Sequence, residues 1–398
     1  MKIKISKVDF VIYALFLALF KIYVIPQFIQ QLLKVILLIG VMFFIITHAN
    51  KKKLLNIIVP FGTIIVLSGI LSYEAGFVGQ QSIYNGLLHA VCIYAIYMIS
   101  DYCAEHDYLD GMVSCLFNIT LIYCLLSLGS MILLGHSDKG TEITYIWGNK
   151  FMTSYYFILW IALFRAKYQK EIGTLKRYEL IYFFSSFIVL LVCRWLYCST
   201  ATIATVLLII IPFVPQRVKQ IATNPITVII AIIAAGVIPF AIDGIIKVEF
   251  VQHVITDILN KSLNLTGRIR IYAFLGQIIS QRTWLGYGYG NTAVESVVGY
   301  GNAQNGLIQL IIDYGLFGTI MFFIIVFQCL KKRQLSDRLE GIYIVLYVMI
   351  ICSIVEISYN YIFYLVLLMI GNFSKKQQVV NIDRGKRALY YKPRSVKL

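Results

Sequence analysis

The chain has 398 residues, of which 59% are hydrophobic and only 14% are charged, and its formal net charge is +16. A soluble domain carries about 25% charged residues, so this composition excludes a water-soluble protein and predicts one embedded in lipid. The basic residues are spread between apolar runs rather than gathered on one polar domain. This argues against nucleic-acid binding and is typical of the signals that orient a chain in a bilayer.

Apolar runs long enough to cross a bilayer recur along the chain, and we expect an all-α polytopic membrane protein with about 12 transmembrane helices. Residues 1–242 should hold the first nine, near 9–25, 28–47, 54–72, 85–100, 111–134, 151–165, 179–196, 199–215 and 225–242. Residues 243–303 form a long polar loop. Residues 304–374 should hold the last three spans, near 304–328, 340–357 and 360–372, before a basic tail at 375–398. The first run lacks a small-residue cleavage site, so no cleavable signal peptide is expected.

Lysine and arginine concentrate in alternate gaps between these runs, for example at 51–53, 165–177 and 331–338 and in the tail. Such gaps face the cytoplasm, so both termini should lie inside and the 243–303 loop outside. The gap at 101–110 departs from the pattern, because it is acidic and yet falls on the inner side. Acidic residues contribute little to the rule, so the predicted topology stands.

The outer loop has helical patterning of its own. Apolar residues recur at helical spacing in two sets, Val251, Val254, Ile255, Ile258 and Leu259, and then Ile271, Phe274, Leu275, Ile278 and Ile279. These sets predict two amphipathic helices at the outer membrane surface, with Thr266 as an N-cap between them. The alternative is a simple lid that packs over the bundle.

Two arginines, Arg268 and Arg270, lie at the expected start of the second loop helix. A helix N-terminus offers free N–H groups and a positive dipole end, and a guanidinium adds a planar fork that matches a phosphate. The pattern therefore indicates an anion site, and the natural anion at this surface is a lipid phosphate or pyrophosphate. The alternatives are non-specific contact with head groups or plain solvation.

Two further stretches follow in the loop. Gly286 and Gly288 alternate with tyrosines, and such glycines allow backbone amides to approach a ligand or to form a tight turn. Gln304 and Asn305 precede the next span, where their amides would face the outer mouth of the bundle and hold sugar hydroxyls. The alternative role for Asn305 is a helix cap.

Taken in order, these pieces resemble a known family. The segments are Thr-Gly-Arg268, Tyr272, Trp284-Leu-Gly-Tyr-Gly, Ala303-Gln-Asn305-Gly-Leu-Ile and Tyr314-Gly-Leu-Phe-Gly318. Their order, and their place in the longest outer loop, resemble the signature region of the O-antigen polymerase and O-antigen ligase (Wzy/WaaL) superfamily. The resemblance covers about 258–318, and the remainder is similar only as a many-span protein.

The resemblance implies a GT-C-like fold in a bacterial cytoplasmic (inner) membrane. It implies transfer of a glycan from an undecaprenyl-pyrophosphate carrier to a sugar hydroxyl, without a metal, cofactor or nucleotide sugar. Arg268 would hold the donor pyrophosphate, and Arg270 or Arg282 would assist. The partners implied are the lipid-linked oligosaccharide, membrane lipids and a chain-length regulator. A repeat-unit polymerase for O-antigen, capsule or exopolysaccharide is favoured by analogy, and a ligase acting on lipid A core is the alternative.

One departure from the family pattern concerns the general base. The family's histidine is Gln304 here, and an amide does not take a proton at neutral pH, although it can orient a hydroxyl. Asp313 is badly placed, because it lies nine residues further on, near the opposite face of the helix. Glu356, near the outer end of its span, is the preferred candidate, with Arg194 as its possible ion-pair partner. The alternative is that Glu356 pairs with another group only structurally.

The remaining reactive residues carry weaker signals. The eight cysteines have no metal-type spacing and are expected to be buried apolar residues. No spacing among the histidines, which are His48, His89, His106, His136 and His253, predicts a zinc site. Lys21 and Lys34, near the first hairpin, either attract phosphates or extend toward the membrane surface.

Two rival classes of protein remain. A flippase or transporter for lipid-linked oligosaccharides would place its polar residues inside the spans and keep its outer loops short. This sequence shows the reverse, with clean spans and a rich outer loop. A membrane scaffold would leave the ordered motif of the outer loop unexplained.

Overall fold

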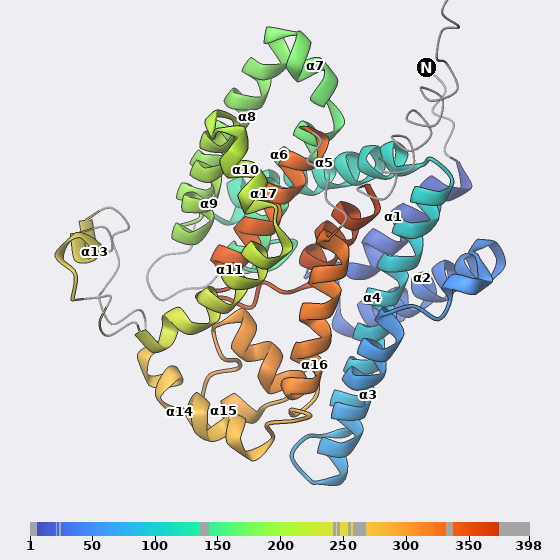
Figure 1. Cartoon of the computed structure of the whole chain (residues 1–398), viewed down its shortest axis with the longest axis vertical. Helices are drawn as coiled ribbons and strands as arrows, with labels where there is room; N and C mark the ends of the chain where they lie inside the picture. Colours follow the sequence, from blue (N-terminus) through green and yellow to red (C-terminus); the bar gives the residue numbers. More distant parts are fainter. Residues whose placement is uncertain are drawn as a thin grey trace, which may run out of the picture.

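The computed structural model describes residues 6–20, 22–23, 25–135, 143–241, 244, 247–253, 256–257, 268–331 and 337–373. Within these ranges the regular secondary structure is helical, apart from one isolated bridge between Tyr145 and Gly148. The expected all-α class is therefore confirmed (Figure 1).

The helices follow one another closely along the chain. In the first half they are α1 (Lys7–Leu19), α2 (Gln27–His48), α3 (Ile58–Glu74), α4 (Gln80–Glu105), α5 (Leu109–Leu134), α6 (Lys150–Lys167), α7 (Gln169–Thr174), α8 (Lys176–Trp195) and α9 (Ser199–Ile210). In the second half they are α10 (Gln216–Ala222), α11 (Pro225–Val237), α13 (Glu249–His253), α14 (Arg268–Gln281), α15 (Ala293–Val298), α16 (Gly306–Leu330) and α17 (Asp337–Cys352). A last helix covers Tyr361–Phe373.

Five helices in the described part of the chain are long and apolar enough to cross a membrane, namely α2, α4, α5, α8 and α16. A sixth would be the pair Gln216–Ala222 and Pro225–Ala241, which is bent by 68°. Four shorter apolar helices, Ile58–Glu74, Ser199–Phe213, Leu339–Cys352 and Tyr361–Phe373, also coincide with expected spans. A helix of 17 residues rises only about 25 Å, against a hydrocarbon core of about 30 Å. The membrane class is thus supported, and the number of 12 spans stays a prediction.

The expected loop helices lie partly within the described residues. The second is α14, in which Ile271, Leu275 and Ile278 are buried and Phe274 is 39% exposed, as an amphipathic helix requires. Of the first, the structure describes α13, Glu249–His253. Its remaining predicted residues, the proposed cap Thr266, Lys21, His136 and the basic tail lie outside the described residues.

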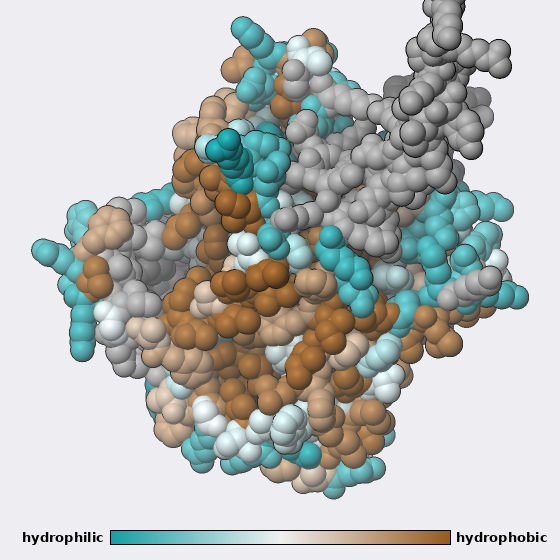
Figure 2. Space-filling model, in the orientation of Figure 1, coloured by the Kyte–Doolittle hydropathy of each residue, from teal (hydrophilic) through white to brown (hydrophobic). Residues whose placement is uncertain are grey.

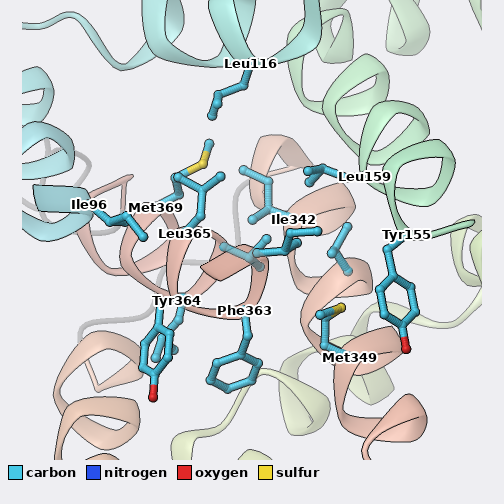
Figure 3. Packing of buried hydrophobic residues seen from close by; sticks show 14 of the residues in the cluster. Ile96, Leu116, Tyr155, Leu159, Ile342, Met349, Phe363, Tyr364, Leu365 and Met369 are labelled. Carbon is cyan, nitrogen blue, oxygen red and sulfur yellow. The ribbon is translucent and has the colours of Figure 1, made fainter. Parts of the chain in front are cut away.

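The core is built where helices from the two ends of the sequence meet. The helix Tyr361–Phe373 is buried along nearly its whole length. Its Leu365 and Met369 pack near Ile342 of α17 and Leu116 of α5 (Figure 3). Other large apolar side chains remain exposed on the flanks, where Figure 2 shows a broad hydrophobic surface. Exposed apolar surface of this extent is expected where the solvent is lipid.

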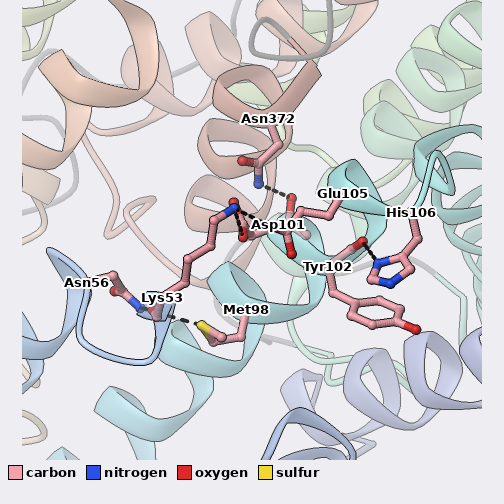
Figure 4. A network of polar contacts seen from close by, with 9 residues as sticks. Lys53, Asn56, Met98, Asp101, Tyr102, Glu105, His106 and Asn372 are labelled. Carbon is pink, nitrogen blue, oxygen red and sulfur yellow. Dashed lines mark hydrogen bonds and ion pairs between the residues drawn. The ribbon is translucent and has the colours of Figure 1, made fainter. Parts of the chain in front are cut away.

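The acidic segment 101–110, which departs from the charge pattern of the other gaps, lies at one end of the bundle. Lys53, which precedes α3, lies 2.7 Å from a carboxylate oxygen of Asp101 and 2.8 Å from one of Glu105, both on α4 (Figure 4). Burial acts to lower the pKa of Lys53, but its hydrogen bonds to the two carboxylates outweigh this and raise that pKa. The acidic residues therefore compensate a neighbouring basic gap instead of opposing it.

The opposite end of the bundle carries α14, α15 and the start of α16 (Figure 1). Because α3 and α4 are antiparallel neighbours, the end of α3 and the beginning of α4 lie here too, far from Lys53. This end corresponds to the predicted outer side, and it contains most of the candidate residues.

Candidate functional site

The span α16 is broken at Gly315, whose φ of 63° and ψ of −167° leave the helical region. The break frees backbone groups on both sides, and the segment 282–291, here called the strap, pairs with them. The hydrogen bonds run from Tyr287 N to Ile312 O (2.7 Å), Gly288 N to Asp313 O (2.8 Å), Leu316 N to Thr283 O (2.9 Å) and Phe317 N to Trp284 O (3.2 Å). Unpaired backbone groups cost several kcal/mol in lipid, so the strap is an integral part of this helix.

Gly286 and Gly288 allow the strap to lie this close. Both have left-handed φ values, 68° and 84°. A Cβ on Gly286 would lie 2.6 Å from the backbone nitrogen of Gly315, and one on Gly288 would lie 2.7 Å from the Cα of Gly69 in α3. Of the two roles considered for these glycines, the structure shows the tight turn, and the space beside them is filled by the protein's own backbone.

Arg282 anchors the strap to the end of α3. Its Nη2 donates to the carbonyl oxygen of Leu71 at 2.9 Å, and its guanidinium carbon lies 4.7 Å from the centre of the Phe77 ring. Hydroxyl groups of α3 and α4 add further anchors, since Ser72 donates to Gly286 O (3.1 Å) and Ser82 to Tyr289 O (3.0 Å). In this structure Arg282 binds a helix end, where an exposed carbonyl and the negative dipole end favour a cation.

The phenol of Tyr287 completes the attachment of the strap to α14. Its hydroxyl donates to Ile278 O at 2.9 Å, and its ring meets that of Phe77 edge-on at 5.5 Å. Burial raises the pKa of Tyr287, although the charge of Arg282 acts in the opposite direction. The phenol therefore stays protonated and remains a donor.

Below the strap lies a buried carboxylate, Asp313, which is 7% exposed. Its Oδ1 accepts hydrogen bonds from Asn291 Nδ2 and from Gln309 Nε2, each at 2.8 Å. The Oε1 of Gln309 in turn accepts from the backbone nitrogen of Ala303 at 2.8 Å. A relay of two side chains thus connects Asp313 with the residue before Gln304.

The sequence argument set Asp313 aside because nine residues separate it from Gln304. In the structure the Gln309 side chain lies between these positions and connects Asp313 with Ala303 through two hydrogen bonds. An acidic residue inside an apolar run is the sequence signal that indicates Asp313 as a functional candidate.

Gln304 adopts a left-handed backbone conformation, with φ of 50°. Asn302 supports it twice, accepting at Oδ1 from the Gln304 backbone nitrogen (2.9 Å) and from its Nε2 (2.8 Å). The hydroxyl of Tyr272 donates to the Gln304 carbonyl oxygen at 3.2 Å. A non-glycine residue keeps such a conformation only where its surroundings enforce it, and such residues cluster at functional sites.

Tyr272 also relates Gln304 to the loop arginines. It lies on α14 one turn after Arg268, which begins that helix. The side chain of Arg268 lies outside the described residues, and Arg270, in the same turn, is exposed. Through Tyr272, the first turn of α14 therefore lies near Gln304.

Asn305 is the N-cap of α16, as the capping alternative predicts. It is fully buried, and its Oδ1 accepts from Ile308 N at 3.0 Å. Its Nδ2 donates to Ala235 O (3.0 Å) and to Ile354 O (3.2 Å). The side chain thus joins α11, α16 and the turn after α17 instead of facing the bundle mouth.

Glu356 lies in that turn, because α17 ends at Cys352 rather than near the expected residue 357. The turn packs against the start of α16 through a 2.8 Å hydrogen bond from Gly306 N to Ser353 O. Glu356 is half-buried, and it interacts electrostatically with Cys198 at the start of α9. Its carboxylate is therefore close to the Gln304 end of α16 and not enclosed within a helix.

Arg194 is an exposed residue in the last turn of α8, three residues before Tyr197 and the short turn into α9. It therefore approaches the same end of the bundle as Glu356. Cys198, in this turn, also interacts electrostatically with Lys150 at the start of α6. Basic and acidic groups from α6, α8 and the turn after α17 are thus brought toward this end of the bundle.

Among the described residues no group of three or more His, Cys, Asp and Glu side chains is arranged to hold a metal ion. No family model matches the chain, and no curated protein matches it. The fold and site therefore define an all-helical membrane protein with a broken span and an attached strap, and its function is argued from the site itself.

Proposed function

We propose that this protein is a membrane glycosyltransferase that joins lipid-pyrophosphate-linked oligosaccharide repeat units on the outer face of a bacterial cytoplasmic membrane. One observation carries the proposal. The motif residues between 268 and 318 assemble around Gln304 into a single hydrogen-bonded unit formed by α14, the strap and the broken α16. A unit of this kind holds its polar groups on rigid elements, which is what positioning of reactants for a group transfer requires.

The first turn of α14 would receive the donor. In the proposed reaction the bond between the anomeric carbon and the pyrophosphate breaks, and the electron pair leaves with the pyrophosphate. The free N–H groups of α14 and the arginines Arg268 and Arg270 would stabilise that charge. The resemblance to the polymerase and ligase superfamily assigns this role to Arg268.

The acceptor hydroxyl would be held beside Gln304. Its oxygen forms the new bond to the anomeric carbon, and its proton must pass to a base. Glu356 is the candidate base because its half-buried carboxylate lies in the turn that packs on the start of α16. Gln309 and Asp313 would act as positioning residues that hold Ala303 and thereby the orientation of Gln304.

A ligase remains an alternative within this class, because it differs only in its acceptor. A transporter of lipid-linked oligosaccharides is the candidate from another class, and one observation favours it. Asp313 and His89 are polar groups buried within the candidate spans α16 and α4. Transporters use such groups along their substrate pathways.

The test supplies lipid-linked repeat units, alone or together with lipid A core, to the purified full chain in detergent, without ATP or an ion gradient. Growth of glycan chains supports the polymerase, and transfer only to lipid A core supports the ligase. In vesicles, movement of the substrate with no new glycosidic bond supports the transporter and overturns the enzyme. Arg268→Ala should abolish chain growth, whereas the control Lys176→Ala, on the exposed first residue of α8, should not.

A further inference from the structure

Lys34 is a cation inside a candidate span that has no anionic partner in the described structure. It lies about two turns into α2. Its Nζ is 3.4 Å from the hydroxyl oxygen of Tyr361 and 5.1 Å from the centre of that ring. No carboxylate among the described residues pairs with it. An ionised group within a span is costly unless it is compensated, which makes it a functional candidate.

The helix face of Lys34 shows that it points into the bundle. Leu38, Val41 and Ile45 follow it at spacings of four, seven and eleven residues, and all three are buried. Exposed residues such as Phe43, which is 68% exposed, lie on the other face of α2. A lysine that merely extended toward the membrane surface would lie on that outer face.

A buried histidine lies behind Tyr361. His89 of α4 is 4% exposed, and its Nδ1 has no hydrogen-bond partner within the described residues. Its ring is 5.1 Å from that of Tyr361 and within electrostatic range of Lys34. A buried polar atom without a partner is destabilising, and in the tautomer that carries the proton on Nδ1 an incoming acceptor would satisfy it.

The group formed by Lys34, Tyr361 and His89 contacts the strap through His89. The ring of His89 stacks on that of Tyr289 at 4.0 Å, with 8° between the planes. Tyr289 follows Gly288, which binds the carbonyl of Asp313. A ligand held at Lys34 would therefore lie next to the candidate site.

We propose that Lys34, Tyr361 and His89 form a binding site for the phosphate group of a membrane lipid that enters between α2 and the helix Tyr361–Phe373. Lys34 and Tyr361 are both half-exposed, so the phosphate would meet them first. The lipid chain would remain outside the bundle, in the bilayer. That this lipid is the isoprenoid diphosphate donor rests on the proposed function, whereas the phosphate site itself does not.

The test measures binding of an isoprenyl diphosphate, of phosphatidylglycerol and of inorganic pyrophosphate to the full chain in detergent. Lys34→Gln should weaken lipid binding by about tenfold or more, because it removes a charge-assisted hydrogen bond. Lys34→Arg should retain most of it, and the control Lys176→Gln should bind as the wild type does. Lys34→Met, which packs as an apolar residue, checks the result if the Gln variant fails to fold.

Each outcome of this binding experiment either supports or overturns the proposed phosphate site. Preference for the isoprenyl diphosphate supports the site as the donor's entrance, and equal binding of phosphatidylglycerol supports a general lipid-phosphate site. Binding of inorganic pyrophosphate alone, or binding of all ligands unaffected by the Lys34 variants, overturns the proposal. Lys34-dependent lipid binding without chain growth would refute the proposed function and leave the site standing.

Discussion

Gln309 donates from its Nε2 to the Oδ1 of Asp313 at 2.8 Å, one turn further along α16. Because the other end of the Gln309 amide accepts from Ala303 N, this pair fixes the backbone that leads into Gln304. Asp313 also lies at the helix break, where its own carbonyl accepts from the strap and from the Ser68 hydroxyl. The break, the strap and the Gln304 turn are therefore mechanically connected through one carboxylate.

Removing the Asp313 carboxylate should destabilise the protein and disturb Gln304. Asp313→Ala removes the acceptor of Gln309 Nε2 and one of the two acceptors of Asn291 Nδ2, which keeps its bond to Gly288 O, and each buried unpaired N–H costs about 1–3 kcal/mol. Asp313→Asn retains an acceptor oxygen and should be milder. Thermal unfolding in detergent measures both variants, and an Asp313→Ala protein that unfolds at the wild-type temperature would refute the proposed connection.

Adding a methyl group at Gly286 should prevent the strap from docking. Gly286→Ala places a Cβ 2.6 Å from the Gly315 nitrogen at a left-handed φ, so either the strap or α16 must move. We expect low yield and early unfolding. The matched control is Gly276→Ala in α14, where a Cβ meets nothing within 4 Å. That control should be neutral or stabilising by up to about 1 kcal/mol. Equal stability of the two variants would argue against tight docking.

Substitution of Gln304 by glycine should change stability and chain growth in opposite directions. Gln304→Gly relieves a left-handed conformation and should stabilise the fold by up to about 1 kcal/mol, while chain growth falls because the amide is lost. Gln304→His should retain chain growth, since it restores the residue of the resembling family. Unfolding temperature and polymer length are the two readouts. Full polymer synthesis by Gln304→Gly would exclude the amide from the reaction.

The interactions of Lys53 predict an alkaline limit to stability. Because its pKa is raised in the folded protein, the stabilisation from its ion pairs is fully present below the ordinary value of 10.5 and is lost as the pH rises through the raised value. Unfolding temperatures from pH 9 upward should therefore fall more steeply for the wild type than for Lys53→Met. If the unfolding temperatures of the wild type and Lys53→Met fall in parallel with pH, the ion pairs of Lys53 contribute nothing to stability.

The predicted topology places α15 outside and the start of α3 inside. A membrane-impermeant thiol reagent added to intact cells should label Ser296→Cys and not Lys51→Cys. The eight native cysteines are buried or only partly exposed, so the background should be low. Labelling of Lys51→Cys but not of Ser296→Cys would show that the chain has the opposite orientation. The proposed reaction could then not take place on the outer face.

Much of the local structure could be predicted because its causes are local. Apolar runs indicate helices, the spacing of Ile271, Leu275 and Ile278 indicates the buried face of α14, and an asparagine before an apolar run indicates the cap that Asn305 forms. The position of Glu356 was less predictable, because a turn ends α17 within an apolar stretch.

By itself the sequence determined that this chain is helical and belongs in lipid, since composition and periodicity reflect the partitioning of each segment between water and the bilayer. Only the tertiary structure decided that Arg282 holds the end of α3, that Gln309 bridges Asp313 to Ala303, and that Lys34 and His89 both lie beside Tyr361. The physical reason is that a buried polar group must find its partner in three dimensions. Which partner it finds depends on which distant segments meet and on where a helix breaks. The apolar pattern of a single segment predicts neither of these.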